Sequence, residues 1–217
     1  MFENKTQVKI CGITSVRQAI EIAKLGVDAI GVISVQESPR YVSDIKESAI
    51  FSELEKSFPS LKKVSVVKNI SIQSIVNKKV IEYKNHVIQL HGDEDIEYCK
   101  TLKKTVPSSD IWKAFRIKSQ NDVELITQYE DFIDGILLDS WNKDTYGGSG
   151  IKIRTEYLQN IKFRKPWWLA GGISAEWIKI IPKYIKPNGF DVSSSVEIRP
   201  GVKDLRKIEE IINYVKN

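Results

Sequence analysis

The sequence predicts an α/β protein with one domain over residues 1–217, a (β/α)8 or TIM barrel. Three observations predict this fold: eight short apolar runs rich in β-branched residues, stretches of helical periodicity between them, and connections too short for a second domain. Several runs are apolar at consecutive positions, which is typical of parallel strands covered on both faces. No linker rich in proline, glycine or serine interrupts the pattern.

The eight predicted strands follow one another along the chain, each with a helix expected after it. They cover residues 8–13, 29–35, 64–68, 87–90, 112–117, 135–139, 167–170 and 189–193. Helical periodicity is clearest after the first strand, at 16–25, and at the end, at 205–215. A doubly wound sheet is the alternative. It would gather the unusual residues at one switch point, whereas here they follow many different strands.

Composition limits the classes of partner. The net charge of +5 suits an anionic metabolite or nucleic acid, but the lysines and arginines are scattered, with no basic block interleaved with aromatics. Nucleic acid is therefore disfavoured, and a small anionic substrate is expected. No run of 18 apolar residues exists to span a membrane, and residues 1–5 lack the features of a signal peptide. We expect a cytoplasmic protein, either a monomer or a homodimer.

The two cysteines cannot form a disulfide framework, and neither belongs to a metal-ligand cluster. Cys99 lies within a helix-like stretch at 94–104 and is expected to pack in the core. Cys11 is different because it ends the first strand beside a glycine that lets backbone or ligand approach. We expect reduced thiols, no metal and no cofactor.

Polar residues that end apolar strands are the candidates for catalysis, because the active face of a (β/α)8 barrel is formed by the carboxyl ends of its strands. Four stand out: Cys11, Arg40, His91 and Asp139. Asp139 ends a nearly wholly apolar run, so partial desolvation should favour its protonated form. Paired across the barrel mouth, Cys11 and Asp139 would supply the base and the acid that a proton-transfer isomerisation requires. The simpler alternatives are a buried thiol and a helix-capping carboxylate.

Groups suited to anions accompany this pair. Gly171-Gly172 and Ser193-Ser194 follow the seventh and eighth strands, where such barrels commonly bind phosphate on backbone N–H groups, and a further glycine-rich segment lies at 147–150. Arg40 can bind a carboxylate or phosphate with two parallel hydrogen bonds, although a single loop arginine is often only solvated. His91 is expected to form part of the site wall, since the sequence offers no metal partner for it.

Taken in order, these segments resemble the phosphoribosylanthranilate isomerase family. The motifs are Lys9-Ile10-Cys11-Gly12-Ile13, Ser38-Pro39-Arg40-Tyr41-Val42, Gln89-Leu90-His91-Gly92, Leu138-Asp139, Gly147-Gly148-Ser149-Gly150, Leu169-Ala170-Gly171-Gly172-Ile173, Asp191-Val192-Ser193-Ser194 and Pro200-Gly201-Val202-Lys203-Asp204. They run from the first strand to the last helix.

The resemblance implies a cofactor-independent Amadori rearrangement of N-(5-phosphoribosyl)anthranilate to 1-(2-carboxyphenylamino)-1-deoxyribulose 5-phosphate, a step of tryptophan biosynthesis. It implies that Asp139 is the general acid, Cys11 the general base and Arg40 the residue that holds the anthranilate carboxylate. The motifs also place Gly171, Gly172, Asp191, Ser193, Ser194 and His91 among the substrate-binding residues.

The chain departs from the family pattern at three places. Residues 32–37 replace a usual Phe-rich strand and Pro-Lys step and end in Gln36-Glu37, Ser195 stands where glycine is usual, and Ser149 replaces a threonine but keeps the hydroxyl. If Ser195 needs a positive φ, the change should cost about 1 kcal/mol or more. Two alternatives follow. One is the sister isomerase of histidine biosynthesis, or a bifunctional enzyme, but that family places an aspartate where Cys11 stands. The other is a non-catalytic phosphate-binding barrel, against which the presence of both Cys11 and Asp139 argues.

Overall fold

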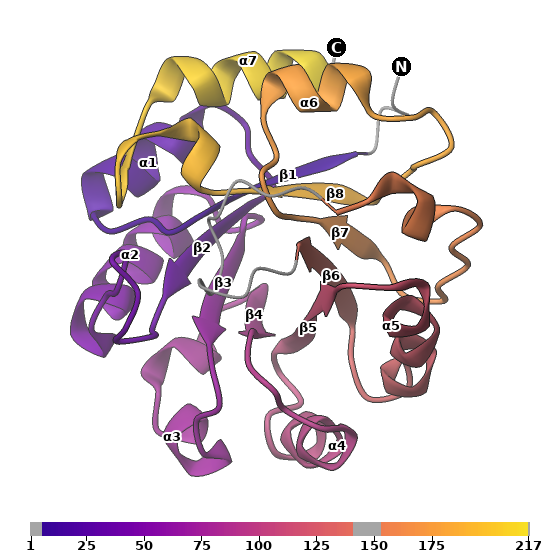
Figure 1. The fold of residues 1–217 in the computed structure, drawn as a ribbon. Helices are drawn as coiled ribbons and strands as arrows, with labels where there is room; N and C mark the ends of the chain where they lie inside the picture. The colour runs from indigo at the N-terminus through magenta and orange to yellow at the C-terminus, as the bar shows by residue number, and fades with distance from the viewer. Residues whose placement is uncertain (1–5, 141–152, 217) are drawn as a thin grey trace.

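A computed structural model describes residues 6–140 and 153–216, and in it eight parallel strands form a closed barrel in chain order (Figure 1). The strands are β1 (Gln7–Cys11), β2 (Ala29–Ile33), β3 (Lys62–Val67), β4 (His86–Leu90), β5 (Asp110–Ile117), β6 (Gly135–Ser140), β7 (Trp167–Leu169) and β8 (Gly189–Val192). The barrel closes where β1 pairs in parallel with β8, for example Lys9 opposite Asp191. The predicted fold and all eight strands are confirmed, with ends shifted by one or two residues.

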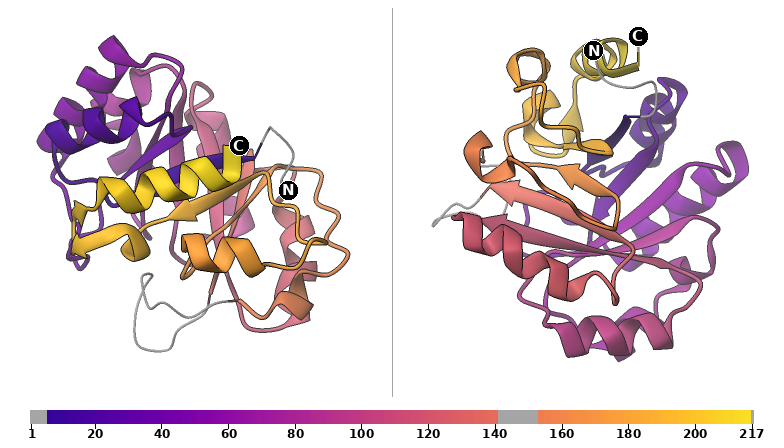
Figure 2. Two further views of the ribbon diagram at one scale, coloured as in Figure 1. Left: turned by 90° about the horizontal axis from the view of Figure 1, so that it is seen from above. Right: turned by 90° about the vertical axis from the view of Figure 1, so that its right-hand side faces the viewer.

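Helices surround the barrel (Figure 2). They are α1 (Val16–Lys24), α2 (Asp44–Ser57), α3 (Ile72–Val76), α4 (Ile96–Thr105), α5 (Gln120–Leu125), α6 (Ala175–Ile180) and α7 (Leu205–Lys216), with short 3-10 turns η1 (Lys79–Glu82), η2 (Ile126–Tyr129), η3 (Thr155–Leu158) and η4 (Ser194–Val196). No helix in the described residues is long and apolar enough to cross a membrane.

The expectation of one helix after every strand is too regular. Between β6 and β7 the described residues contain only the 3-10 turn η3. After β8 the chain forms η4 and then a small antiparallel hairpin of β9 (Glu197–Arg199) and β10 (Val202–Lys203) before α7 begins. This hairpin lies between the last strand and the last helix, so it adds a structured loop to the mouth of the barrel.

Local sequence explains where α1 starts and stops. The Ser15 side chain accepts a hydrogen bond from the backbone N–H of Gln18 at 3.3 Å, which caps the first turn. The helix buries Ala19, Ile22 and Ala23 against the barrel. It ends at Lys24, and two residues later Gly26 has a φ of +85°, the left-handed conformation that glycine adopts without steric penalty.

Two tryptophans fill the inside of the barrel. Trp112 and Trp168 stack with their ring centroids 4.9 Å apart. Glycines make room for them, because a Cβ on Gly135 would lie 2.6 Å from Trp112 and one on Gly189 would lie 2.4 Å from Trp168. Cys11 and Ala170 belong to the same inner cluster. The interior is therefore packed, as in other barrels of this type, and a ligand can enter only at its end.

A buried polar network joins α2 to the outside of the barrel wall. Glu47 is fully buried and accepts hydrogen bonds from Ser65 Oγ at 2.6 Å and Lys78 Nζ at 2.6 Å. Ser65 Oγ and Ser109 Oγ each lie 2.9 Å from a ring nitrogen of His86. Because the Ser65 hydroxyl donates its only hydrogen to Glu47, it must accept from His86 Nε2–H, and Nδ1 then accepts from Ser109. The network therefore fits a neutral His86.

This network predicts an acid-sensitive stability. Burial, aided by Lys78 and Lys63, lowers the pKa of His86 from 6.5 to about 3. In the unfolded chain His86 gains a proton near pH 6.5, whereas the folded protein resists protonation down to about pH 3. The stabilising contribution of neutral His86 should therefore be fully present above pH 6.5. Between pH 6.5 and about pH 3, the loss of this contribution should lower the free energy of unfolding by about 1.4 kcal/mol for each pH unit of acidification.

The measurement is urea unfolding at pH 7.5, 6.0 and 5.0 for the wild type and for His86→Gln, which cannot titrate. Subtracting the two pH dependences removes the contribution of the carboxylates. Equal slopes for the two proteins would contradict the prediction.

Candidate active site

A cavity of about 520 Å³ opens at the carboxyl ends of the strands. All nine site residues selected from the sequence line it, namely Cys11, Arg40, His91, Asp139, Gly171, Gly172, Asp191, Ser193 and Ser194. They come from the ends of six strands and their following loops. The glycine-rich segment 147–150 lies outside the described residues.

Cys11 ends β1 and is only 6% exposed. Lys9 lies two residues earlier, so both side chains point into the barrel. The two pack over Gly31 of β2, where an added Cβ would lie 2.8 Å from Cys11 Sγ and 3.2 Å from Lys9 Cε. A glycine at this position therefore leaves the space in which the thiol and the lysine meet.

Lys9 is fully buried and is paired with Asp191 of β8, whose two carboxylate oxygens each lie 2.8 Å from Nζ. Burial alone would lower the pKa of Lys9, but the attraction of Asp191 and of Cys11 raises it, so the lysine stays charged. Burial raises the pKa of the Cys11 thiol, while the positive charges of Lys9 and Lys203 oppose that rise. Lys9 therefore supplies the nearby cation that a thiolate requires.

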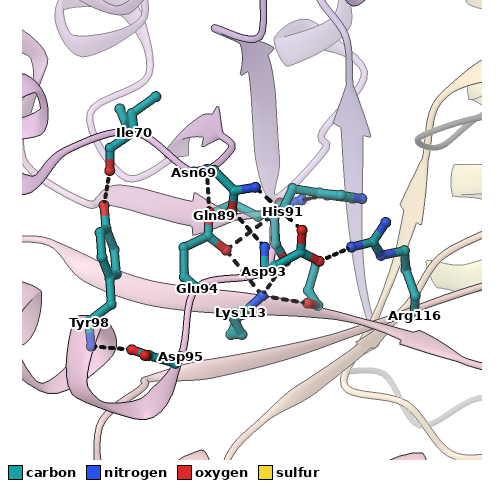
Figure 3. Close-up of polar contacts among 12 residues, drawn as sticks. Asn69, Ile70, Gln89, His91, Asp93, Glu94, Asp95, Tyr98, Lys113 and Arg116 are labelled. Atoms are coloured by element: carbon teal, nitrogen blue, oxygen red, sulfur yellow. Dashed lines mark hydrogen bonds and ion pairs between the residues drawn. The ribbon is translucent and has the colours of Figure 1, made fainter.

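Asp139, on β6, is 5% exposed and is held at both oxygens. Its Oδ1 accepts from the backbone N–H of Ser140 at 2.8 Å, and its Oδ2 lies 3.3 Å from His91 Nε2. Gln89 Nε2 donates to His91 Nδ1 at 3.0 Å (Figure 3), so Nδ1 is an acceptor and the N–H of Nε2 faces Asp139. His91 thus orients the carboxyl group. Gln89 Oε1 has no hydrogen-bond partner among the described residues.

Arg40 is held in a loop that returns to β2. Its backbone N–H bonds to Ser38 Oγ at 3.1 Å, and Tyr41 forms a parallel bridge with Ile33. Arg40 lines the cavity, and one edge of its guanidinium is paired with Glu197 of β9. The predicted carboxylate-binding residue is therefore in the site, and it already has an acidic partner. The acidic Glu37 also lines the cavity.

Backbone after β7 is arranged for an anion. Gly171 and Gly172 have φ values of +81° and +64°, and a Cβ on Gly171 would lie 2.5 Å from Ser140 Oγ. No acceptor in the described part of the chain takes the N–H of either glycine. Both line the cavity together with Ser193 and Ser194 from the loop after β8. Successive free N–H groups of this kind suit a phosphate.

Ser195 does not carry the strain that a positive φ would impose. The non-glycine residues with positive φ in the described chain are Asn69, Asn85 and Asn160. Ser195 lies within η4, and its hydroxyl donates to the carbonyl of Ile173, which joins the loop after β8 to the loop after β7. The serine therefore fits this backbone and connects the loops after β7 and β8, which the sequence predicts to bind phosphate.

A second hollow of about 430 Å³ is lined by the loop after β4, by β5 and by residues that follow β5. Two acidic residues of this hollow form ion pairs with two basic ones (Figure 3): Glu94 pairs with Lys113 at 3.2 Å, and Asp93 pairs with Arg116. Glu94 also accepts from the backbone N–H groups of Asn69 and Gly92, at 2.8 and 3.0 Å. This cluster ties the loops after β3 and β4 to β5.

Four residues that contact the predicted site residues were not predicted from the sequence: Lys9, Gln89, Glu197 and Lys203. Two of them had a usable signal, because Lys9 and Gln89 precede Cys11 and His91 by two residues and therefore share their inward face. Glu197 had none, since its partner Arg40 is 157 residues away. Among the described residues no cluster of histidine, cysteine and carboxylate side chains could hold a metal ion. Cys99 is fully buried in α4, as predicted.

Comparison with known proteins adds independent findings. Residues 8–214 match the family model described as N-(5'phosphoribosyl)anthranilate (PRA) isomerase. The chain is 36% identical over 207 residues to the N-(5'-phosphoribosyl)anthranilate isomerase of Synechococcus elongatus, covering 95% of this chain and 94% of that one.

Two solved structures are similar over nearly their whole length. The phosphoribosyl anthranilate isomerase of Thermotoga maritima superposes with a TM-score of 0.85 at 29% identity, covering 97% of this chain and 98% of that one. A phosphoribosyl anthranilate isomerase in complex with reduced 1-(o-carboxyphenylamino)-1-deoxyribulose 5-phosphate superposes with a TM-score of 0.78, also at 29% identity, covering 97% and 98%.

Proposed function

The chain belongs to the N-(5'-phosphoribosyl)anthranilate isomerase family, and we propose that Cys11 and Asp139 carry out the proton transfers of its reaction. The reaction is the Amadori rearrangement of N-(5-phosphoribosyl)anthranilate to 1-(2-carboxyphenylamino)-1-deoxyribulose 5-phosphate in tryptophan biosynthesis. The observation that carries the proposal is that one cavity holds Cys11 and Asp139 together with groups for both anionic ends of this substrate.

Asp139 acts first, as the general acid. It protonates the furanose ring oxygen, the bond from that oxygen to C1′ breaks, and the lone pair of the anthranilate nitrogen forms a C1′=N double bond. The resulting Schiff base is cationic at nitrogen. The hydrogen bonds from Ser140 N–H and His91 Nε2 hold the carboxyl group in place and stabilise the carboxylate that remains.

Cys11 acts second, as the general base. Its thiolate removes the proton from C2′, the C2′–H electron pair forms a C1′=C2′ double bond, and the iminium electrons return to nitrogen. The enolamine then tautomerises to the ketone. Asp139 has lost one proton and Cys11 has gained one, and exchange with water restores both. Lys9 favours the thiolate because its buried charge lies next to the sulfur.

Binding groups lie on either side of Cys11 along the barrel wall. Arg40, from the loop after β2, is positioned to take the anthranilate carboxylate. Gly171 and Gly172 after β7 and Ser193 and Ser194 after β8 are positioned to take the phosphate. Asp191 shapes the site through Lys9, with which its carboxylate is fully paired. All these groups come from one chain, and they can have these roles in a monomer or in a homodimer.

The test is the loss of anthranilate fluorescence when the substrate is generated in situ. We expect the wild type to abolish the emission and to do so equally in the presence of EDTA, because no step uses a metal. If the protein binds a reduced product analogue but leaves the emission unchanged, the catalytic proposal fails. Turnover of the histidine-pathway substrate at a comparable rate would instead support the bifunctional alternative.

A further inference from the structure

The Arg40 guanidinium is fixed by a bidentate ion pair. Its Nε donates to Glu197 Oε1 at 2.9 Å and its Nη2 donates to Oε2 at 2.7 Å. The two side chains are only 12% and 5% exposed. A paired, planar geometry of this kind sets the orientation of the guanidinium plane as well as its position.

Glu197 is itself held by the hairpin that follows β8. Its Oε1 also accepts from Lys203 Nζ at 2.8 Å and from the backbone N–H of Gly201 at 3.1 Å. Lys203 Nζ donates in addition to the carbonyl of Ser193, at 3.0 Å. Burial alone would raise the pKa of Glu197, but the hydrogen bonds from Arg40 and Lys203 hold it below its ordinary value, so the carboxylate stays charged.

The stem of Arg40 reaches Glu197 by crossing the loop after β1. A Cβ on Gly12 would lie 2.6 Å from Arg40 Cδ, and Gly12 has a φ of +80°, so this position suits only glycine. Thr14 Oγ1 donates to the Gly201 carbonyl at 2.8 Å, which ties the same loop to the hairpin. The loops after β1, β2 and β8 therefore meet at the Arg40–Glu197 pair.

A guanidinium has two edges that can each bind a carboxylate. Glu197 occupies the edge formed by Nε and Nη2. No acceptor among the described residues takes the edge formed by Nη1 and Nη2, on a side chain that lines the cavity. We propose that Glu197 is a positioning residue that aims this second edge of Arg40 at the ring carboxylate of the substrate and so sets the preference for a carboxylated aromatic amine. The inference rests on the role of Arg40 in the proposed function.

The substitution Glu197→Gln tests this interaction selectively. A glutamine can keep its carbonyl oxygen towards Arg40 Nε, Lys203 and Gly201, but its NH2 group then faces Arg40 Nη2, so the second bond is lost. Glu197→Asp keeps the carboxylate but has a side chain one methylene shorter, which weakens its contact with Arg40. This variant is used instead if thermal unfolding shows that Glu197→Gln does not fold. Glu21→Gln is the matched control, because Glu21 pairs with Arg17 on the surface of α1 at 2.8 Å.

The measurement is the inhibition constant of two analogues that differ only in the ring carboxylate, the 2-carboxyphenylamino and phenylamino derivatives of 1-deoxyribitol 5-phosphate. We expect Glu197→Gln to raise the inhibition constant of the carboxylated analogue by about 10-fold. The inhibition constant of the phenylamino analogue should stay within about twofold of the wild-type value. In an Arg40→Met background the same substitution should have no further effect on either analogue. Glu21→Gln should change neither.

Three results would overturn the inference. Tighter binding of the carboxylated analogue by Glu197→Gln would mean that Glu197 competes with the substrate for Arg40. Equal weakening of both analogues, or the same weakening in the Arg40→Met background, would mean that Glu197 acts only through the fold. If Arg40→Met itself does not reduce the preference for the carboxylated analogue, the assignment of Arg40 in the proposed function fails as well.

Discussion

Replacing Asp139 with asparagine should lower kcat by about 10²- to 10⁴-fold, the range typical of a lost general acid. Asparagine has nearly the same shape, and its carbonyl oxygen can still accept from Ser140 N–H, so the fold should be kept. What it cannot do is give a proton to the ring oxygen. The rate is followed by the decay of anthranilate fluorescence, with substrate generated in situ.

The control for Asp139→Asn is Asp93→Asn. Asp93 lies at the same rim but in the second hollow, where it pairs with Arg116, so its loss should leave kcat within about twofold. Binding of the reduced product analogue by Asp139→Asn should stay within about tenfold of the wild type, because the anion-binding groups are untouched. More than a tenth of the wild-type rate in Asp139→Asn would exclude this residue as the acid.

Replacing Cys11 with serine should have an effect of the same size, about 10²- to 10⁴-fold on kcat. The hydroxyl fits the space over Gly31, but it does not ionise near neutral pH, so the base is missing. Cys99→Ala is the matched control, because Cys99 is fully buried in α4 and does not line the cavity. It should reduce stability and leave kcat unchanged. Equal losses of kcat in the two variants would contradict the assignment.

The pH profile separates a base at Cys11 from a merely structural thiol. Burial raises the pKa of Cys11 above its ordinary value of 9.0. A base must be deprotonated to act, so kcat/KM of the wild type should keep rising with pH through the alkaline range. Cys11→Asp should recover part of the activity lost in Cys11→Ser and should lack this alkaline rise, because a carboxylate is already ionised at neutral pH. If kcat/KM of Cys11→Asp shows the same alkaline rise, the rise comes from the deprotonation of a group other than Cys11.

Much of the site was predictable because the barrel itself brings distant residues together. Cys11, His91 and Asp139 each end a strand, and the carboxyl ends of all the strands of a (β/α)8 barrel meet at one face. Once the eight strands were identified, no further information was needed to place these side chains in a common cavity. The loop glycines after β7 followed from the same rule. The helix positions were less predictable, because loop length and capping allow a 3-10 turn or a hairpin in place of a helix.

The fold, the family and the residues at the strand ends could be predicted from the sequence alone, since these depend on local periodicity and on the order of motifs. Which charged side chains pair with each other became clear from the three-dimensional arrangement of the strands and loops. Lys9 meets Asp191 because β1 and β8 close the barrel, and Arg40 meets Glu197 because three loops converge over Gly12. Such pairs join residues more than 150 positions apart. No local pattern encodes them, because a charge on a loop has the same sequence signature whether it is solvated or held by a buried partner.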